Sequence, residues 1–212
     1  YEVTNSQYQR FLIETHYKPK VMKNFLKHWK KPEGKDSEPY LWQIPEGKEN
    51  HPVVYVDLND ARFYARWAKK RLPTEEEWQY AAQGNDGRKW PWGDEYDETR
   101  CNGIDGTKGR KNDIEGSFGQ TTPVDAYPKG ASPFGCLDMS GNVWEWTESE
   151  RNDGHTRYAI LRSGCHFRAG GSLWYVSGGA QPCDRHVKML LLYPGLDRCS
   201  TIGFRCVKDI GE

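Results

Sequence analysis

The chain has 212 residues, of which 30 are basic and 30 acidic, so its formal net charge is zero. This balance excludes binding to nucleic acid or to an anionic membrane surface through bulk charge. A mean hydropathy of −0.92 and the lack of a long apolar run exclude a membrane-spanning helix. The 9 Trp, 12 Tyr and 22 Gly predict a loop-rich domain whose core is closed by aromatic side chains.

In chain order, the pattern predicts three helices in the first half. The first begins after Thr4, which is followed three residues later by a glutamine, as in a capping box. The second begins after Asp57 or Asn59, and the third begins after Thr74, which opens another capping box. The polar, proline-containing segment 18–50 between the first two helices is expected to be an irregular insertion over the surface.

Short strands are predicted where β-branched and aromatic residues cluster between turn residues. They are expected at 51–56, 143–147, 158–162, 188–192 and 202–207. After residue 84 helical periodicity disappears, and Gly, Pro, Asn and Asp interrupt almost every short run. Because the chain contains neither an internal repeat nor a low-complexity linker, residues 1–212 are predicted to form a single domain.

Three segments carry a specific pattern: RLPTEEEW at 71–78, MSGNVWEWT at 139–147 and TIGFRC at 201–206. Two weaker segments support them: EVTN at 2–5 and WPWG at 90–93. In this order they resemble the formylglycine-generating-enzyme, or sulfatase-modifying-factor, family over essentially the whole chain, without the family's usual first strand. The resemblance implies an α+β domain of the C-type-lectin-like kind, with little regular secondary structure. Oxidases, sulfoxide synthase modules and binding proteins share this fold, so it does not settle function.

The resemblance also implies structural calcium at one or two sites. The first set comprises the carboxylates of Asp138 and Glu145 and the carbonyls of Gly141 and Val143. The second set comprises Asn102, the carbonyls of Gly103 and Phe118, and an acid near Asp113 or Glu115. Here the family's aspartate aligns with Gly116, which weakens the second site. Calcium prefers six to eight oxygens from carboxylates and turn carbonyls, but these residues also suit plain hydrogen bonding between turns.

Formylglycine synthesis in the family implies two cysteines, five positions apart, close after a Gly-Gly-Ser and bound to Cu(I). Aligned on 163–165, the cysteine positions fall on Arg168 and Leu173. Aligned on 170–172, they fall on Tyr175 and Ala180. Neither alignment yields the pair, so the chain is predicted to lack formylglycine-generating activity.

A rearranged thiol site is the alternative, giving a copper- or iron-dependent oxidoreductase that acts on thiol or sulfur compounds with O2. Its candidate ligands share one segment: Cys165, His166, Cys183 and His186. Sulfoxide synthases use histidines from a helical domain that this chain lacks. The simpler interpretation is that these are buried thiols and surface histidines.

Cysteine positions also bear on the compartment. The family's disulfide partners of Cys183 and Cys206 align with Ala65 and Ala82 here, so those bridges are not expected. Missing bridges agree with a reducing compartment and favour a cytoplasmic location.

Segment 163–200 has the composition of a recognition loop, because it is rich in Gly, Ser, aromatic, Arg and His residues and lacks Glu and Asn. Its predicted ligand-binding anchors are Trp174, Tyr175, Arg185, His186 and Tyr193. The same aromatics also suit closure of a core that is poor in aliphatics. The favoured function is therefore binding of a protein or small-molecule ligand through this surface, with further domains allowed in the natural chain.

A narrower form of this hypothesis is a variable receptor of a diversity-generating retroelement. Codons ending in C do not encode Glu, Lys, Gln, Met or Trp, and within 163–187 only Trp174 and Gln181 break that restriction. The run at 188–192, in contrast, is typical of an ordinary fixed strand.

Overall fold

The computed structural model describes residues 1–33, 38–103, 120–167, 179–193 and 195–211. Its α-helices are α1 (Asn5–Thr15), α2 (Leu58–Trp67) and α3 (Glu75–Gln83). Its strands are β1 (Trp144–Asn152), β2 (Arg157–Arg162), β3 (Gly164–Cys165), β4 (Gly179–Ala180), β5 (Val187–Leu190) and β6 (Ile202–Phe204). Single 3-10 turns are η1 (Pro39–Leu41), η2 (Glu98–Arg100) and η4 (Pro128–Gly130). The α+β class with little regular structure is confirmed.

All three helix starts predicted from capping patterns are confirmed. Thr4, Asp57 and Thr74 are the N-caps, and each accepts from the backbone N–H three residues later. In every case the side chain at that third position bonds back to the cap backbone. For α2 the cap is therefore Asp57 and not Asn59.

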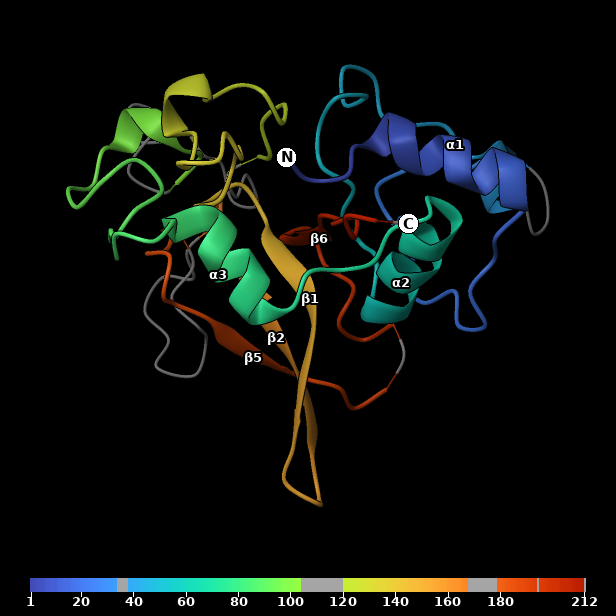
Figure 1. Ribbon diagram of the computed structural model, residues 1–212. Coiled ribbons are helices and arrows are strands. Elements are labelled where there is room, and N and C mark those ends of the chain that lie inside the picture. The colour runs from blue at the N-terminus through green and yellow to red at the C-terminus, as the bar shows by residue number, and fades with distance from the viewer. Residues whose placement is uncertain (34–37, 104–119, 168–178, 194, 212) are drawn as a thin grey trace.

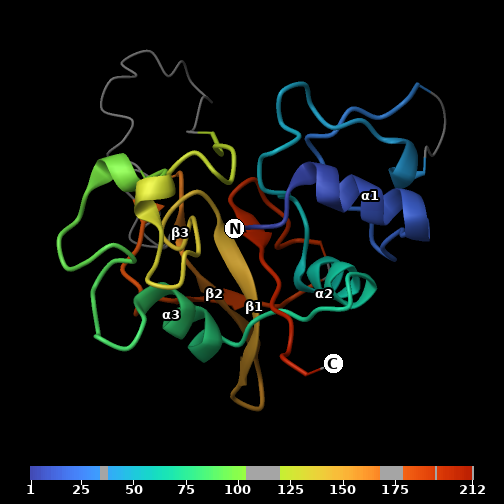
Figure 2. The ribbon, with the colours of Figure 1, turned by 45° about the horizontal axis from the view of Figure 1, so that its top comes forward.

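A four-stranded sheet in the order β5-β2-β1-β6 forms the centre of the molecule. β1 pairs antiparallel with β2 and parallel with β6, and β2 pairs antiparallel with β5. Helix α3 lies beside β1 and β2, whereas α1 and α2 lie on the other side of β1 (Figures 1 and 2). The far end of the β1–β2 hairpin projects away from the helices (Figure 1).

Two expectations about the first half are wrong. Residues 51–56 form no strand beyond an isolated bridge between Thr4 and Pro52, because Tyr55 has a left-handed backbone (φ 60°) that interrupts the extended chain. Segment 18–50 is irregular as expected, but it is not confined to the surface. It supplies buried core side chains: Phe25, Leu26, Trp29 and Trp42.

The small β3–β4 ladder depends on a glycine. Gly164 has φ 94°, and a Cβ there would lie 2.1 Å from the Gly179 carbonyl oxygen. Gly154, at the tip of the β1–β2 hairpin, has φ 90° but nothing within 4 Å of its Cβ position. The two glycines therefore share a backbone conformation and differ in crowding.

We expect Gly164→Ala to lower the free energy of unfolding by about 1–3 kcal/mol more than Gly154→Ala. Both variants carry the cost of a left-handed alanine, about 1–2 kcal/mol, so their difference isolates the steric clash. Urea denaturation of the two variants measures it. Equal losses of unfolding free energy in the two variants would show that strands β3 and β4 move apart without an energetic cost.

Candidate functional site

A cavity of about 720 Å³ lies where the irregular first-half segment meets three later loops. One wall comes from the first 55 residues: Asn5, His28, Pro45, Lys48, Pro52 and Tyr55. The other wall comes from later segments: Gln120, Thr121, His166, Phe167 and Ser200. Its volume falls within the usual range of small-molecule sites, about 300–1,000 Å³.

His166 presents an acceptor nitrogen rather than a charge. Its Nδ1 lies 2.8 Å from the Asn142 carbonyl oxygen, which only accepts, so Nδ1 carries the proton. Nε2 is therefore the atom with the free lone pair. Burial lowers the pKa of this imidazole below its ordinary value, which keeps the ring neutral at neutral pH.

The turn beneath His166 is held by the side chain of Asn142. Its Oδ1 accepts from Asn102 Nδ2 at 3.1 Å and from the Thr122 N–H at 3.0 Å. Its Nδ2 donates to Glu2 Oε1 at 3.0 Å. Asn142 has φ 58°, a conformation that asparagine tolerates better than most residues. Four distant segments are thereby fixed around one edge of the cavity.

Tyr55 and His28 form an aromatic part of the opposite wall. Their rings stack with centroids 5.3 Å apart. The left-handed backbone of Tyr55 is held by hydrogen bonds of its N–H to the Cys199 carbonyl and of its carbonyl to the Leu26 N–H. Such a conformation in a bulky residue is costly and is found most often at functional sites. Burial first, and the nearby Lys48 charge second, lower the pKa of His28 to about 4.

Lys48 is the cationic side chain among the described residues that line the cavity. Its Nζ donates to Gln120 Oε1 at 3.1 Å, and no ion pair to it occurs among the residues described above. Partial burial lowers the pKa of Lys48. Its charge in turn contributes to lowering the pKa values of His28 and His166.

The predicted binding anchors separate in the structure. Arg185 and His186 are exposed and do not line the cavity. Tyr193, 57% exposed, lines a different and smaller cavity of about 220 Å³. Trp174 and Tyr175 lie outside the described residues. From segment 163–200, the large cavity takes His166, Phe167 and Ser200.

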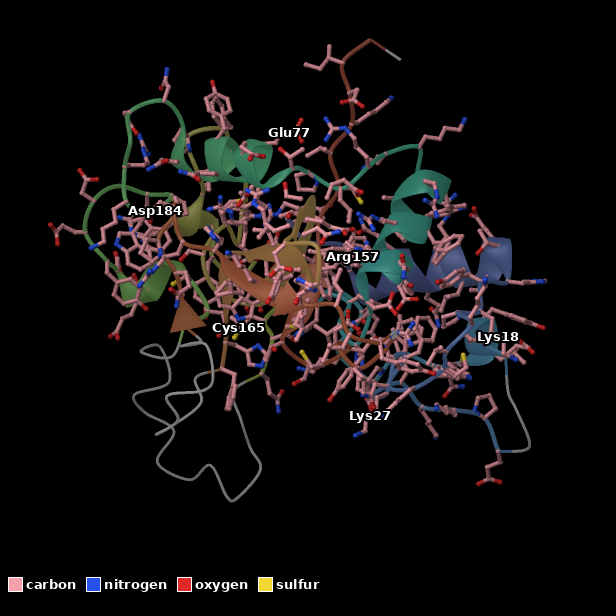
Figure 3. All side chains as sticks on the ribbon, turned by 90° about the horizontal axis from the view of Figure 1, so that it is seen from below. Lys18, Lys27, Glu77, Arg157, Cys165 and Asp184 are labelled. Atoms are coloured by element: carbon pink, nitrogen blue, oxygen red, sulfur yellow. The ribbon has the colours of Figure 1, made fainter. Side chains whose placement is uncertain are left out.

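The candidate thiols are not brought together. Cys165 packs in the main core, and its Sγ lies 3.1 Å from the Phe167 carbonyl oxygen. Cys183 belongs to a separate cluster with Trp78 and Met139. Cys165 also lies well away from Asp184, the neighbour of Cys183 (Figure 3). Burial raises the pKa of both thiols, that of Cys183 to about 12, and neither thiol forms a disulfide.

Within the described segments no three His, Cys, Asp or Glu side chains form a metal-binding group. The first predicted calcium set shows why. Glu145, fully buried, accepts from Arg205 Nε at 2.5 Å, from Arg205 Nη2 at 2.6 Å and from Trp78 Nε1 at 2.8 Å. The Gly141 carbonyl accepts from Ser163 Oγ at 2.9 Å. Glu145 is thus already paired with a cation.

Asp138 fits a cation better. It is 3% exposed, and neither of its carboxylate oxygens has a hydrogen-bond partner. Oε2 of the fully buried Glu2 is likewise unpartnered. Burial raises the pKa of Asp138 to about 7, and burial together with the charge of Asp138 raises that of Glu2. The charge of Arg205 opposes both shifts without reversing them. Buried carboxylate oxygens without hydrogen-bond partners are costly, so oxygens of this kind suit calcium.

The second predicted calcium set is only partly described. The Asn102 side chain donates to the Gln120 carbonyl and to Asn142, so it stabilises the turn at 142. Gly103 lies against Ala180 and Tyr96. The other positions named for this set, Asp113, Glu115, Gly116 and Phe118, lie outside the described residues.

Sequence reasoning missed Lys48, His28, Tyr55 and Glu2. Lys48 and His28 lie in the polar segment 18–50, whose composition predicts an irregular surface insertion. For Glu2 the sequence offers one indication of its role: an acidic residue stands just before helix α1, part of which is buried. For Tyr55 the sequence offers no such indication, because its positive φ depends on hydrogen bonds with the distant residues Leu26 and Cys199.

Comparison with known proteins agrees with this fold. Residues 1–210 match the family model described as the Sulfatase-modifying factor enzyme 1-like domain. The formylglycine-generating enzyme of Streptomyces coelicolor is 47% identical over 196 residues, covering 86% of this chain and 58% of that protein. Inactive C-alpha-formylglycine-generating enzyme 2 of Bos taurus is 35% identical over 162 residues, covering 76% of this chain and 51% of that protein. The chain thus spans little more than half the length of these relatives.

Solved structures share the architecture at low identity. CarF superposes with a TM-score of 0.63 at 21% identity, covering 99% of this chain and 84% of CarF. Treponema denticola variable protein 1 superposes with a TM-score of 0.55 at 20% identity, covering 96% and 80%. None of the helices in the described part of the chain has the length and apolar composition needed to cross a bilayer. The chain belongs to the sulfatase-modifying-factor family, which is the family of the formylglycine-generating enzymes.

Proposed function

We propose that this chain is a ligand-binding domain of the family, without formylglycine-generating activity, and that it binds a small molecule or short peptide in the 720 Å³ cavity. The cavity itself carries the proposal, since it combines apolar walls, a few polar groups and a strained aromatic residue. The positions expected for the copper-binding cysteine pair hold Arg168 and Leu173, or Tyr175 and Ala180, which supports a non-catalytic role.

The metal-dependent oxidoreductase is the weaker proposal. It needs thiolates that converge, whereas Cys165 and Cys183 lie in separate clusters and burial raises the pKa of each. His186 is exposed, and His166 contacts the turn at Asn142. The variable-receptor form of the binding hypothesis rests on the composition of 163–187 alone.

Calcium belongs to the proposal as a structural ion. Asp138 and Glu2 would hold it, because their unpartnered buried oxygens supply the negative charge that a divalent cation neutralises. Its chemistry would be purely electrostatic, joining the N-terminal segment to the turn that carries Asn142. Glu145 would remain with Arg205.

Cavity binding is tested with N-phenyl-1-naphthylamine, a neutral apolar dye whose fluorescence rises in apolar pockets. We expect saturable binding to the native chain and at least about tenfold weaker binding to Ser200→Trp, because the indole fills the cavity from its exposed rim. The matched control is His155→Trp, at the exposed tip of the β1–β2 hairpin. Unsaturable binding, or equal affinities for the two tryptophan variants, would overturn the proposal.

A further inference from the structure

We infer that the cavity selects ligands in which an anionic group, such as a carboxylate, sulfonate or phosphate, is joined to an apolar body. Lys48 is the anchor for the anion. The inference rests on the proposed function and adds the chemical class of the ligand.

The Lys48 charge is not used elsewhere in the described structure. An ammonium group has three donors, and Nζ donates one hydrogen bond, to a neutral amide oxygen, Gln120 Oε1, at 3.1 Å. No described carboxylate lies within 4.0 Å of Nζ, although ion pairs of this kind link many other basic residues of the chain. Two donors and a full positive charge are therefore available to a ligand.

The backbone of Lys48 is fixed, while its ammonium group keeps two donors for a ligand. Its N–H donates to the Pro45 carbonyl at 3.0 Å. Its carbonyl accepts from Asn5 Nδ2 at 2.8 Å and from the His51 N–H at 3.2 Å. Asn5 is held in turn by Trp29 Nε1, which donates to its Oδ1 at 3.2 Å. A fixed backbone lowers the entropy lost when the side chain is immobilised by a ligand.

The rest of the lining leaves the cavity positive. The lining residues that the structure describes include no acidic side chain, and the two histidines among them are neutral because burial lowers the pKa of each. A ligand anion thus meets a cation without a competing carboxylate. The apolar walls at Pro45, Pro52, Tyr55 and Phe167 suit the uncharged part of the ligand.

The test compares two dyes of similar shape, the anionic 1-anilinonaphthalene-8-sulfonate and the neutral N-phenyl-1-naphthylamine. We expect Lys48→Met to weaken binding of the sulfonate by about 10- to 100-fold, because a charge-assisted hydrogen bond is lost. The same variant is expected to change the affinity for the neutral dye by less than about twofold. Lys48→Arg, which keeps the charge, is expected to retain sulfonate binding.

Lys188→Met is the matched control, since it removes an exposed lysine from strand β5 outside the cavity. It keeps the net charge equal to that of Lys48→Met and is expected to change neither affinity. Unchanged sulfonate affinity in Lys48→Met, with the neutral dye still bound, would overturn this inference and leave the proposed function standing. Equal loss of both dyes from Lys48→Met at an unchanged melting temperature would also overturn it. Failure of the native chain to bind either dye would overturn both proposals.

Discussion

Arg205→Met is expected to lower the free energy of unfolding by about 3–5 kcal/mol. The guanidinium bonds both oxygens of Glu145, which is fully buried, and also donates to the Leu137 and Asp138 carbonyls. Burial alone would lower the pKa of Arg205, but the Glu145 carboxylate holds it above its ordinary value. Without the arginine, that carboxylate keeps Trp78 as a donor and loses its counter-charge.

Urea denaturation measures this loss, and Arg71→Met is its control. Like Arg205, Arg71 forms ion pairs, in its case with Glu77 and Asp209, but its side chain is 38% exposed. Its removal is therefore expected to lower the free energy of unfolding by less than about 1 kcal/mol. The double variant Arg205→Met/Glu145→Gln is expected to regain part of the loss, because it leaves no unpaired buried charge. A loss for Arg205→Met no larger than that for Arg71→Met would contradict the assignment of Glu145 to a closed ion pair.

The features predicted from the sequence are those encoded locally. Each capping box joins residues three positions apart, so Thr4, Asp57 and Thr74 are recognisable without tertiary information. The strands of the β1–β2 hairpin are predicted by short runs of β-branched and aromatic residues. The overall architecture, in contrast, is predicted only by the resemblance to the family. The strand predicted at 51–56 fails because a positive φ at Tyr55 depends on distant backbone partners.

The candidate site could be predicted only in part, since one wall comes from the first 55 residues and the other from residue 120 onward. Segment 163–200 was identified by composition, and it does contribute His166. Composition does not indicate which other loop faces this segment, so the sequence predicts a surface position for Lys48 and not a place in the cavity wall. The same limit applies to Glu2, whose importance follows from burial beside Asp138.

Asp138→Asn is expected to stabilise the calcium-free chain by about 1–3 kcal/mol near pH 8. The variant removes a buried carboxylate whose two oxygens have no hydrogen-bond partner, and its amide supplies a donor where Glu2 Oε2 has none. Asp138 has φ 53°, and asparagine tolerates this left-handed conformation, so the backbone is kept. Urea denaturation in the presence of a calcium chelator measures the difference between the two proteins.

The sign of the pH dependence follows from the direction of the pKa shift. Burial raises the pKa of Asp138 to about 7 in the folded chain, whereas an unfolded aspartate titrates near 4. The penalty is therefore fully present above about pH 7 and is relieved as the pH falls through the folded pKa towards 4. The advantage of Asp138→Asn should accordingly shrink between pH 8 and pH 5. The buried histidines, whose pKa values are lowered, make an opposite contribution to the pH dependence of stability. This contribution cancels when the unfolding free energy of the variant is compared with that of the native chain at each pH.

Calcium is expected to reverse the order of stability at pH 8. Bound to the charged Asp138 and Glu2, it stabilises the native chain by mass action, and Asp138→Asn loses a charged ligand and gains less. The melting temperature of the native chain should therefore rise with calcium concentration more steeply than that of the variant, and magnesium should act more weakly because it dehydrates reluctantly. Equal calcium responses in the two proteins would contradict a site at Asp138, whereas a calcium-free variant less stable than the native chain would contradict the unpaired state of its carboxylate.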